Sequence, residues 1–384
     1  MLDIAFSFLV ATVSPGWTAA LSPDAITGIT VAGTVVVGGG GAAEAFDERT
    51  GRKRWKKGES HAFLSLGADV VLGQPGGRIE RVDARSGTIR WVARVCPVDK
   101  YATALAQSAG GIVVGCTGGR VARVDPYVGR VTARSDAMHL DMIDRISWAG
   151  GCHLNLLAHQ SGAILSEQDE IVSCRSLQPV MPQRQEVLFL GTVGDRAVLA
   201  DQCCGLSGAM EQPVRVFTID GATGAESPEL QFVPGEPFLA GAQVCVGQHD
   251  AIRCRPVGSS TMGEVRVTNL SDFPVITDAG EIGISRLKGA GVFAELDDVT
   301  TGNFHRVWSG FIAGLPFGNS DPVGSVPVRA ASGAEVVSRD GMRTEVPMGA
   351  LLVTSDQHFV FMRLSRTLAE NRYVEELLAI PWLH

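Results

Sequence analysis

Short runs of β-branched residues alternate with glycine-rich turns and half-polar segments along much of the chain. Four apolar runs stand out, at residues 34–37, 70–72, 112–114 and 197–199. Consecutive apolar positions are typical of strands that are covered on both faces. The segments that follow mix charged and apolar residues, as in Arg78-Ile79-Glu80-Arg81-Val82. The pattern therefore predicts sheets that run from a buried inner part to a half-polar outer part.

The half-polar segments end in one recurring motif, an Asp followed four residues later by a Gly. The copies are Asp47 and Gly51, Asp83 and Gly87, Asp125 and Gly129, and Asp220 and Gly224, with Trp55 and Trp91 following the first two. An Asp side chain can accept hydrogen bonds from backbone N–H groups two residues on, and Gly adopts a positive φ without a steric penalty. Each copy is therefore expected to form a hairpin turn.

The spacing of the motif indicates repeated units. Asp47 and Asp83 are 36 residues apart, Asp83 and Asp125 are 42 apart, and Asp125 and Asp220 are 95 apart. The long interval fits two units, so a degenerate unit is expected at residues 146–175. A looser copy contains Asp298 and Gly302, and further degenerate units are expected near 240–270 and 333–380. The total is eight, or seven if two degenerate stretches form one unit.

A repeated four-stranded unit can bury its faces only against neighbouring units. The sequence therefore predicts an all-β protein that forms a single β-propeller of antiparallel blades over residues 21–384. The motif Ala-x-Asp-x-x-Thr/Ser-Gly-x-x-x-Trp resembles the tryptophan-docking repeat of the quinoprotein-like propellers, also called PQQ-like repeats. The resemblance is strong over residues 30–135, moderate over 190–230 and faint elsewhere. It implies that Trp55 and Trp91 pack between blades. Three positions depart from the repeat: Arg81 replaces the usual Ala, and Ala133 and Pro228 replace the usual Trp.

The N-terminus resembles an export segment. Ile4 to Val13 is apolar but too short to span a bilayer, and small residues precede a predicted cleavage after Ala20, so residues 1–20 are interpreted as a signal peptide. However, this segment contains Asp3 and no Lys or Arg before its apolar stretch. The lack of a basic residue indicates either a misassigned start codon or an N-terminal segment that is instead a strand closing the ring.

Composition narrows the range of partners. The chain has 384 residues, 45% of them hydrophobic, and a formal net charge of −8, so a nucleic-acid partner is not expected. No segment elsewhere in the chain reaches eighteen uninterrupted apolar residues, so no transmembrane segment is expected. A monomer is expected. Six basic residues nevertheless surround the first turn: Arg49, Arg52, Lys53, Arg54, Lys56 and Lys57. They form either a solvated hairpin at the rim or a contact for an acidic partner or anionic polymer.

Eight cysteines indicate an oxidising compartment, and therefore a periplasmic or extracellular protein. Eight cysteines allow 105 pairings. Cys245 with Cys254 is favoured because the two lie on expected hairpin arms, and Cys152 with Cys174 and Cys96 with Cys116 follow by proximity. The neighbours Cys203 and Cys204 could form a strained redox pair like that of the quinoprotein alcohol dehydrogenases, or each could pair elsewhere or be buried.

The chain contains no Gly-x-Ser-x-Gly elbow, no phosphate-binding loop and no Cys or His spacing typical of zinc. The acidic residues around His139 are interpreted as a solvated connector, with a metal site as the alternative, so no catalytic residue, metal or cofactor is predicted. The preferred hypothesis is a non-catalytic, exported PQQ-like propeller that binds a protein partner in the cell envelope. The alternatives are a PQQ-dependent dehydrogenase, for which Cys203 and Cys204 are the main indication, and a propeller that binds a small ligand or glycan in its central funnel.

Overall fold

The computed structural model describes residues 15–23, 25–135, 142–159, 167–181, 187–201, 213–227, 230–232, 236–240, 242–247, 251–257, 263–266, 273–276, 281–288, 291–298, 306–312, 326–328, 334–337, 343–347, 350–367 and 373–382. These residues form antiparallel strands and turns, without a helix, in eight hydrogen-bonded sheets. The predicted all-β class and propeller fold are confirmed. The number of blades stays a prediction, because β16 and β17 join two groups of strands through one residue pair, Asp169 with Val187.

The first three sheets have four strands each, in sequence order. The first contains β2 (Ala25–Val31), β3 (Thr34–Gly39), β4 (Glu44–Asp47) and β5 (Lys53–Lys56). The second contains β6 (Ala62–Leu66), β7 (Asp69–Gln74), β8 (Arg78–Asp83) and β9 (Ile89–Arg94). The third contains β10 (Ala102–Ser108), β11 (Gly111–Cys116), β12 (Val121–Val124) and β13 (Val131–Ser135).

The middle of the chain continues this order. A seven-stranded sheet contains β14 (Met142–Trp148), β15 (His153–His159), β16 (Glu167–Ser173), β17 (Val187–Val193), β18 (Arg196–Asp201), β19 (Arg215–Asp220) and β20 (Leu230–Gln231). Two four-stranded sheets follow: β21 (Glu236–Ala240), β22 (Gln243–Gly247), β23 (Ala251–Pro256) and β24 (Gly263–Arg266), then β25 (Phe273–Ile276), β26 (Glu281–Lys288), β27 (Gly291–Asp298) and β28 (Arg306–Ile312). The unit expected at residues 146–175 corresponds to β14–β16.

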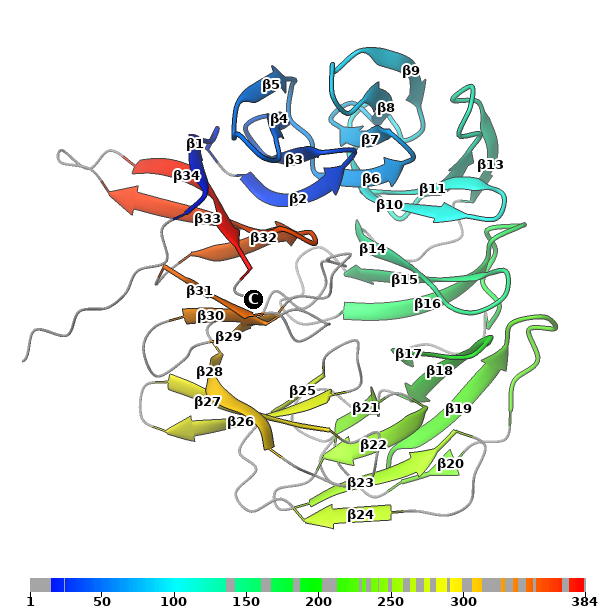
Figure 1. Ribbon diagram of the computed structural model, residues 1–384. Helices are drawn as coiled ribbons and strands as arrows, with labels where there is room; N and C mark the ends of the chain where they lie inside the picture. The colour runs from blue at the N-terminus through cyan, green and yellow to red at the C-terminus, as the bar shows by residue number, and fades with distance from the viewer. Residues whose placement is uncertain are drawn as a thin grey trace, which may run out of the picture.

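The last two sheets bring the chain back to its start. They contain β29 (Val326–Val328), β30 (Ala334–Val337) and β31 (Arg343–Val346), then β32 (Leu351–Ser355), β33 (Phe359–Thr367), β34 (Tyr373–Pro381) and the N-terminal β1 (Trp17–Ala20). Figure 1 shows the sheets following one another around a central region, with the blue β1 beside the red β34. Strands from the two ends of the chain therefore share one sheet.

The hydrophobic core lies between neighbouring sheets. In β3, Val36 packs toward the second sheet, whereas Val35 and Val37 pack toward the last one. In β7, Val71 faces the third sheet, and Val70 and Leu72 face the first. Because successive side chains of a strand point to opposite faces, a run of consecutive valines fills two cores at once. This explains why the second strand of these sheets is continuously apolar.

Candidate interaction site

The Asp-to-Gly motif forms the same turn at each described copy. Asp47 Oδ1 accepts hydrogen bonds from the backbone N–H of Arg49 (3.2 Å) and Thr50 (2.9 Å) and from the Thr50 hydroxyl (2.8 Å). The Gly51 N–H donates to the carbonyl oxygen of Asp47 at 2.9 Å, and Gly51 has a φ of +67°. The hydrogen bond from Arg54, followed by that from Thr50, holds the pKa of Asp47 well below its usual range. The carboxylate therefore acts as a charged acceptor that fixes the turn.

The other three predicted turns repeat this geometry. Their carboxylates accept backbone N–H bonds at 2.8–3.1 Å, and their glycines have φ between +70° and +71°: Asp83 with Gly87, Asp125 with Gly129, and Asp220 with Gly224. Asp298 ends β27, whereas Gly302 lies outside the described residues. The turns are thus formed by local hydrogen bonds that the sequence motif specifies directly.

A fifth turn of this kind was missed by the sequence analysis. Ser173 takes the place of Asp, and its Oγ accepts from the N–H of Arg175 (3.2 Å) and Ser176 (3.4 Å). Leu177 takes the place of Gly at a φ of +58° and is fully buried. A search for Asp and Gly cannot find this copy, although it lies midway between Asp125 and Asp220, where the spacing predicted a unit.

Tryptophans dock on the glycines of neighbouring turns. The indole N–H of Trp55 donates to the Ala84 carbonyl oxygen at 2.8 Å, and its ring covers Gly87, where a Cβ would lie 2.7 Å from the indole Cγ. The Trp91 indole likewise donates to the Pro126 carbonyl oxygen at 3.0 Å and covers Gly129. Each glycine therefore serves both the turn and the contact between sheets.

Trp17 makes the same contact at the closure of the ring. Its indole N–H donates to the Glu48 carbonyl oxygen at 2.8 Å, and the ring covers Gly51. Trp17 belongs to the segment interpreted as a signal peptide, and the tryptophan-docking motif was not recognised there because the preceding repeat elements are at the other end of the chain. Cleavage after Ala20 would remove this residue and all of β1.

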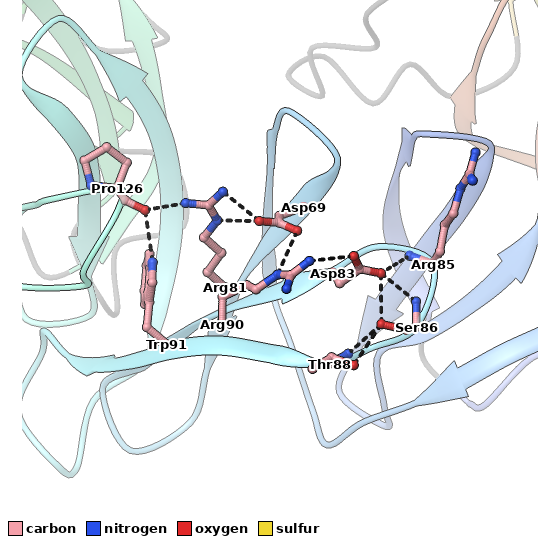
Figure 2. Close-up of polar contacts among 9 residues, drawn as sticks. All are labelled: Asp69, Arg81, Asp83, Arg85, Ser86, Thr88, Arg90, Trp91 and Pro126. Atoms are coloured by element: carbon pink, nitrogen blue, oxygen red, sulfur yellow. Dashed lines mark hydrogen bonds and ion pairs between the residues drawn. The ribbon is translucent and has the colours of Figure 1, made fainter.

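Arginines assist or replace the docking tryptophans. The Arg81 guanidinium binds the buried carboxylate of Asp69 at 2.6 Å and donates to the Pro126 carbonyl oxygen at 2.7 Å, beside Trp91 (Figure 2). One turn on, where Ala133 replaces Trp, Arg123 alone donates to the equivalent carbonyl oxygen, that of Cys174, at 2.9 Å. The departures from the repeat at these positions therefore preserve the hydrogen bond between sheets.

Figure 2 also shows that Arg90 is held on the outer strand by acidic residues. Its guanidinium lies 2.9 Å from Asp83 and 3.5 Å from Asp69. Asp83 accepts N–H bonds from its own turn, chiefly that of Ser86, which lower its pKa. The lowered pKa keeps Asp83 charged, and the ion pairs with Asp69 and Asp83 fix the arginines, so this network is structural and orients basic groups at the rim.

The third turn exposes apolar side chains. Tyr127 is 82% and Val128 is 65% exposed, whereas the equivalent residues of the first turn are Arg49 and Thr50. The backbone of this turn is rigid because Asp125 holds it and Pro126 is bound by Arg81 and Trp91. A rigid, exposed aromatic residue is a typical anchor in protein–protein interfaces.

The outer hairpins of the first three sheets, β4–β5, β8–β9 and β12–β13, carry most of the exposed basic residues of this region. We call their exposed surface the basic rim. Its basic members are Arg49, Arg52, Lys53, Lys56, Arg78, Arg85, Arg90, Arg94, Arg130 and Arg134. The six basic residues noted around the first turn lie in that turn, in β5 or next to β5, and four of them belong to the basic rim.

A groove of about 350 Å³ lies where the first and second sheets meet. It is lined by Lys57, Arg78, Glu80 and the half-exposed Ile89, among others. Glu80 is buried and lies 3.9 Å from the Lys57 ammonium and 3.5 Å from the Arg78 guanidinium. The groove therefore adjoins the basic rim and combines an apolar wall with basic groups.

Three disulfides join the described cysteines. They are Cys96–Cys116, Cys152–Cys174 and Cys245–Cys254, the same pairs that the sequence analysis favoured. Cys245 and Cys254 are directly opposite in the register of β22 and β23. Cys203 and Cys204 lie outside the described residues, so the hypothesis of a redox pair there stays untested. Disulfides are typical of proteins in oxidising compartments.

Within the described part of the chain, no group of three or more His, Cys, Asp or Glu residues is arranged to hold a metal ion. In the same part of the chain, no helix has the length and apolar character needed to cross a membrane.

Residues 10–141 match the model of a family described as outer membrane protein assembly factor BamB. No curated protein matches the chain. Among solved structures, BamB from Moraxella catarrhalis is 18% identical, with 69% of this chain and 76% of that chain covered and a TM-score of 0.39. The quinohemoprotein alcohol dehydrogenase ADHIIG from Pseudomonas putida HK5 is 13% identical, with 96% and 76% covered and a TM-score of 0.46. The computationally designed Ika8 protein is 14% identical, with 94% and 98% covered and a TM-score of 0.48.

Proposed function

We propose that the protein is a non-catalytic, exported propeller of the PQQ-like superfamily that binds a protein partner in the cell envelope. The match of residues 10–141 to a family described as outer membrane protein assembly factor BamB supports this proposal. The observation that carries the proposal is the rigid third turn, which presents Tyr127 and Val128 to solvent. The description of the matching family as an outer membrane protein assembly factor supports an envelope location. The three disulfides support an oxidising compartment.

The third turn is suited to binding for energetic reasons. Exposed Tyr and Val side chains cost little to order when the backbone that carries them is already fixed, so more of the contact energy is retained on association. The turn lies beside β9, whose Ile89 and Val92 are also about half exposed. Of these two residues, Ile89 lines the groove toward the first sheet, so the second sheet also exposes apolar groups.

Photo-cross-linking tests this proposal. Benzoylphenylalanine is placed at Tyr127 in the full chain expressed in its own cells, and the cross-linked proteins are identified by mass spectrometry. The complex with an identified protein is then reconstituted from purified components. The matched control carries the same group at Thr223, an exposed residue of the equivalent turn at Asp220. We expect an envelope protein to be cross-linked at 127 but not at 223, and to bind a monomeric propeller in solution. Adducts of equal yield at both positions, or none at 127, would contradict the proposal.

The dehydrogenase alternative is tested on the same purified protein. It is incubated with pyrroloquinoline quinone and Ca²⁺, freed of excess quinone by gel filtration, and assayed for dye reduction with alcohols and aldoses. We expect no stoichiometric retention of quinone and no turnover. Retention together with turnover would show that the protein is an enzyme.

A further inference from the structure

The charge of the chain is distributed unevenly. Residues 44–135 contain sixteen Lys and Arg residues and nine Asp and Glu residues, a net charge of +7, although the whole chain has a net charge of −8. The first three sheets are therefore strongly basic compared with the rest of the chain. A local excess of this size creates a positive potential that attracts acidic molecules.

Burial increases the contrast at the surface. Of the nine acidic residues in this region only Asp99 is exposed, whereas ten of the sixteen basic residues are. Glu44, for example, is buried beneath Lys53, with 2.6 Å between the carboxylate oxygen and the ammonium nitrogen. The acids thus lie inside and orient the basic side chains, and the surface presented to a partner is basic.

Part of the basic rim is not engaged within the molecule. Among the described residues, the side chains of Arg94, Arg130 and Arg134 form no ion pair. Arg94 ends β9 and Arg134 lies in β13, so the two belong to the outer strands of neighbouring sheets. They are available to bind carboxylates without loss of an internal contact.

Apolar residues are interspersed with these arginines. Val92 lies between Arg90 and Arg94 on β9, and Tyr127 and Val128 precede Arg130. Arginine and tyrosine are enriched at the centres of protein–protein interfaces, and this mixture favours a polypeptide over a lipid surface or a uniform polyanion. Basic residues also protect the edges of sheets from pairing. That role does not account for basic residues in the turns or for an exposed tyrosine.

We infer that the basic rim binds an acidic segment of a protein partner, with carboxylates on the arginines of β9 and β13 and apolar side chains against Tyr127 and Val128. The inference rests on the proposed function and adds the chemistry of the partner. The groove beside Ile89 extends the same surface toward the first sheet.

Charge reversal tests the inference. The probe is a fluorescein-labelled peptide of about twenty residues that repeats Asp-Glu-Leu-Tyr, and its binding to the full chain is followed by fluorescence polarisation. The test variant is Arg94→Glu with Arg134→Glu. The control variant, Arg196→Glu with Arg215→Glu, makes the same change in charge at exposed positions of β18 and β19. Thermal melting verifies that both are folded.

We expect the test variant to bind the peptide about tenfold more weakly and the affinity of the control to change by less than about twofold. Only in the test variant do two glutamates in the basic rim repel the acidic peptide where two arginines attracted it. Equal losses in both variants would overturn the inference, since binding would then follow total charge. Binding to phosphatidylglycerol vesicles in place of the peptide would also overturn it.

The photo-cross-link at Tyr127 separates this inference from the proposed function. If the identified partner is cross-linked equally in the wild type and in the Arg94→Glu, Arg134→Glu variant, the proposed function stands and the acidic-segment inference fails. If the wild type itself gives no adduct at Tyr127, the proposed function fails, regardless of how tightly the acidic peptide binds. Loss of the adduct in the test variant alone supports both.

Discussion

Removal of the N-terminal strand is expected to open the ring. Trp17 is 9% exposed and packs against Phe46 and Phe361, with ring centroids 6.5 Å and 5.9 Å apart. Loss of a buried Trp side chain costs about 4 kcal/mol, which includes the interior contacts and the cavity that remains. For a chain of this size the loss corresponds to a fall in Tm of about 5 °C. Deletion through Ala20 also removes the four residue pairs between β1 and β34 and should therefore cost more.

Two truncations and one substitution measure this effect. Chains that begin at Gly16 or at Leu21 are purified and melted beside a full-length Trp17→Ala variant. Of the two truncations and the substitution, we expect the Gly16 chain to be the most stable. The Trp17→Ala variant should melt about 5 °C lower than the full-length chain, and the Leu21 chain should melt lower still. Trp148→Ala is the matched control, because Trp148 is 52% exposed and its removal should change Tm by less than about 1 °C.

The result also bears on processing. A Leu21 chain as stable as the Gly16 chain would refute the structural role of β1 and would favour the predicted cleavage after Ala20. A large loss of stability would count against cleavage after Ala20, because that cleavage would remove the strand that closes the ring.

Three further predictions concern turns, pH and disulfides. Gly87→Ala should destabilise the protein by about 2–3 kcal/mol in urea titration, because the new Cβ meets both a positive φ and the docked indole; Gly67→Ala, with the same sign of φ and open space around it, should cost only about 1 kcal/mol. Burial, and then the nearby carboxylate of Asp356, raise the pKa of Glu48 above its ordinary value of 4.5. Protonated Glu48 therefore stabilises the folded state at low pH, and this contribution to the free energy of unfolding is lost as the pH rises above 4.5. Glu48→Gln should therefore gain stability relative to the wild type as pH rises from about 4 to 7, and a Tm difference that is constant with pH would contradict this. Replacing both cysteines of the Cys96–Cys116 disulfide with Ser should cost about 3 kcal/mol, since the bond closes a loop of 20 residues, and an unchanged urea midpoint would contradict this.

The sequence predicted those features that depend on local chemistry. An Asp that accepts nearby N–H bonds, followed by a Gly at positive φ, is complete within five residues, so Asp47, Asp83, Asp125 and Asp220 could be assigned from the motif alone. The apolar runs were equally informative, because a strand between two neighbours needs hydrophobic residues on both faces. These two signals were sufficient for the fold class.

The motif could not predict the places where other residue types form the same turn or the same hydrogen bond. Ser173 and Leu177 form a turn without either residue of the motif, since a hydroxyl can accept the same N–H bonds and the surrounding core fixes a positive φ in Leu177. Arg123 binds the carbonyl oxygen that a tryptophan would otherwise bind. A motif search depends on residue identity, whereas the fold requires only an acceptor, a bend or a donor at the right place.

The closure of the ring shows the same limit at long range. Trp17 pairs with Ala379, so its strand partner is more than 360 residues away, and no local pattern distinguishes it from the end of an export segment. The docking geometry does make the distinction, because Trp17 covers Gly51 and binds the Glu48 carbonyl oxygen just as Trp55 covers Gly87 and binds that of Ala84. Because the turns at Asp83, Asp125 and Ser173 each receive an indole or a guanidinium from the preceding sheet, the first turn is expected to receive a donor from the last sheet. Trp17 is that donor, and its role in closure can be inferred from the repeat even though the residue stands outside every copy of the motif.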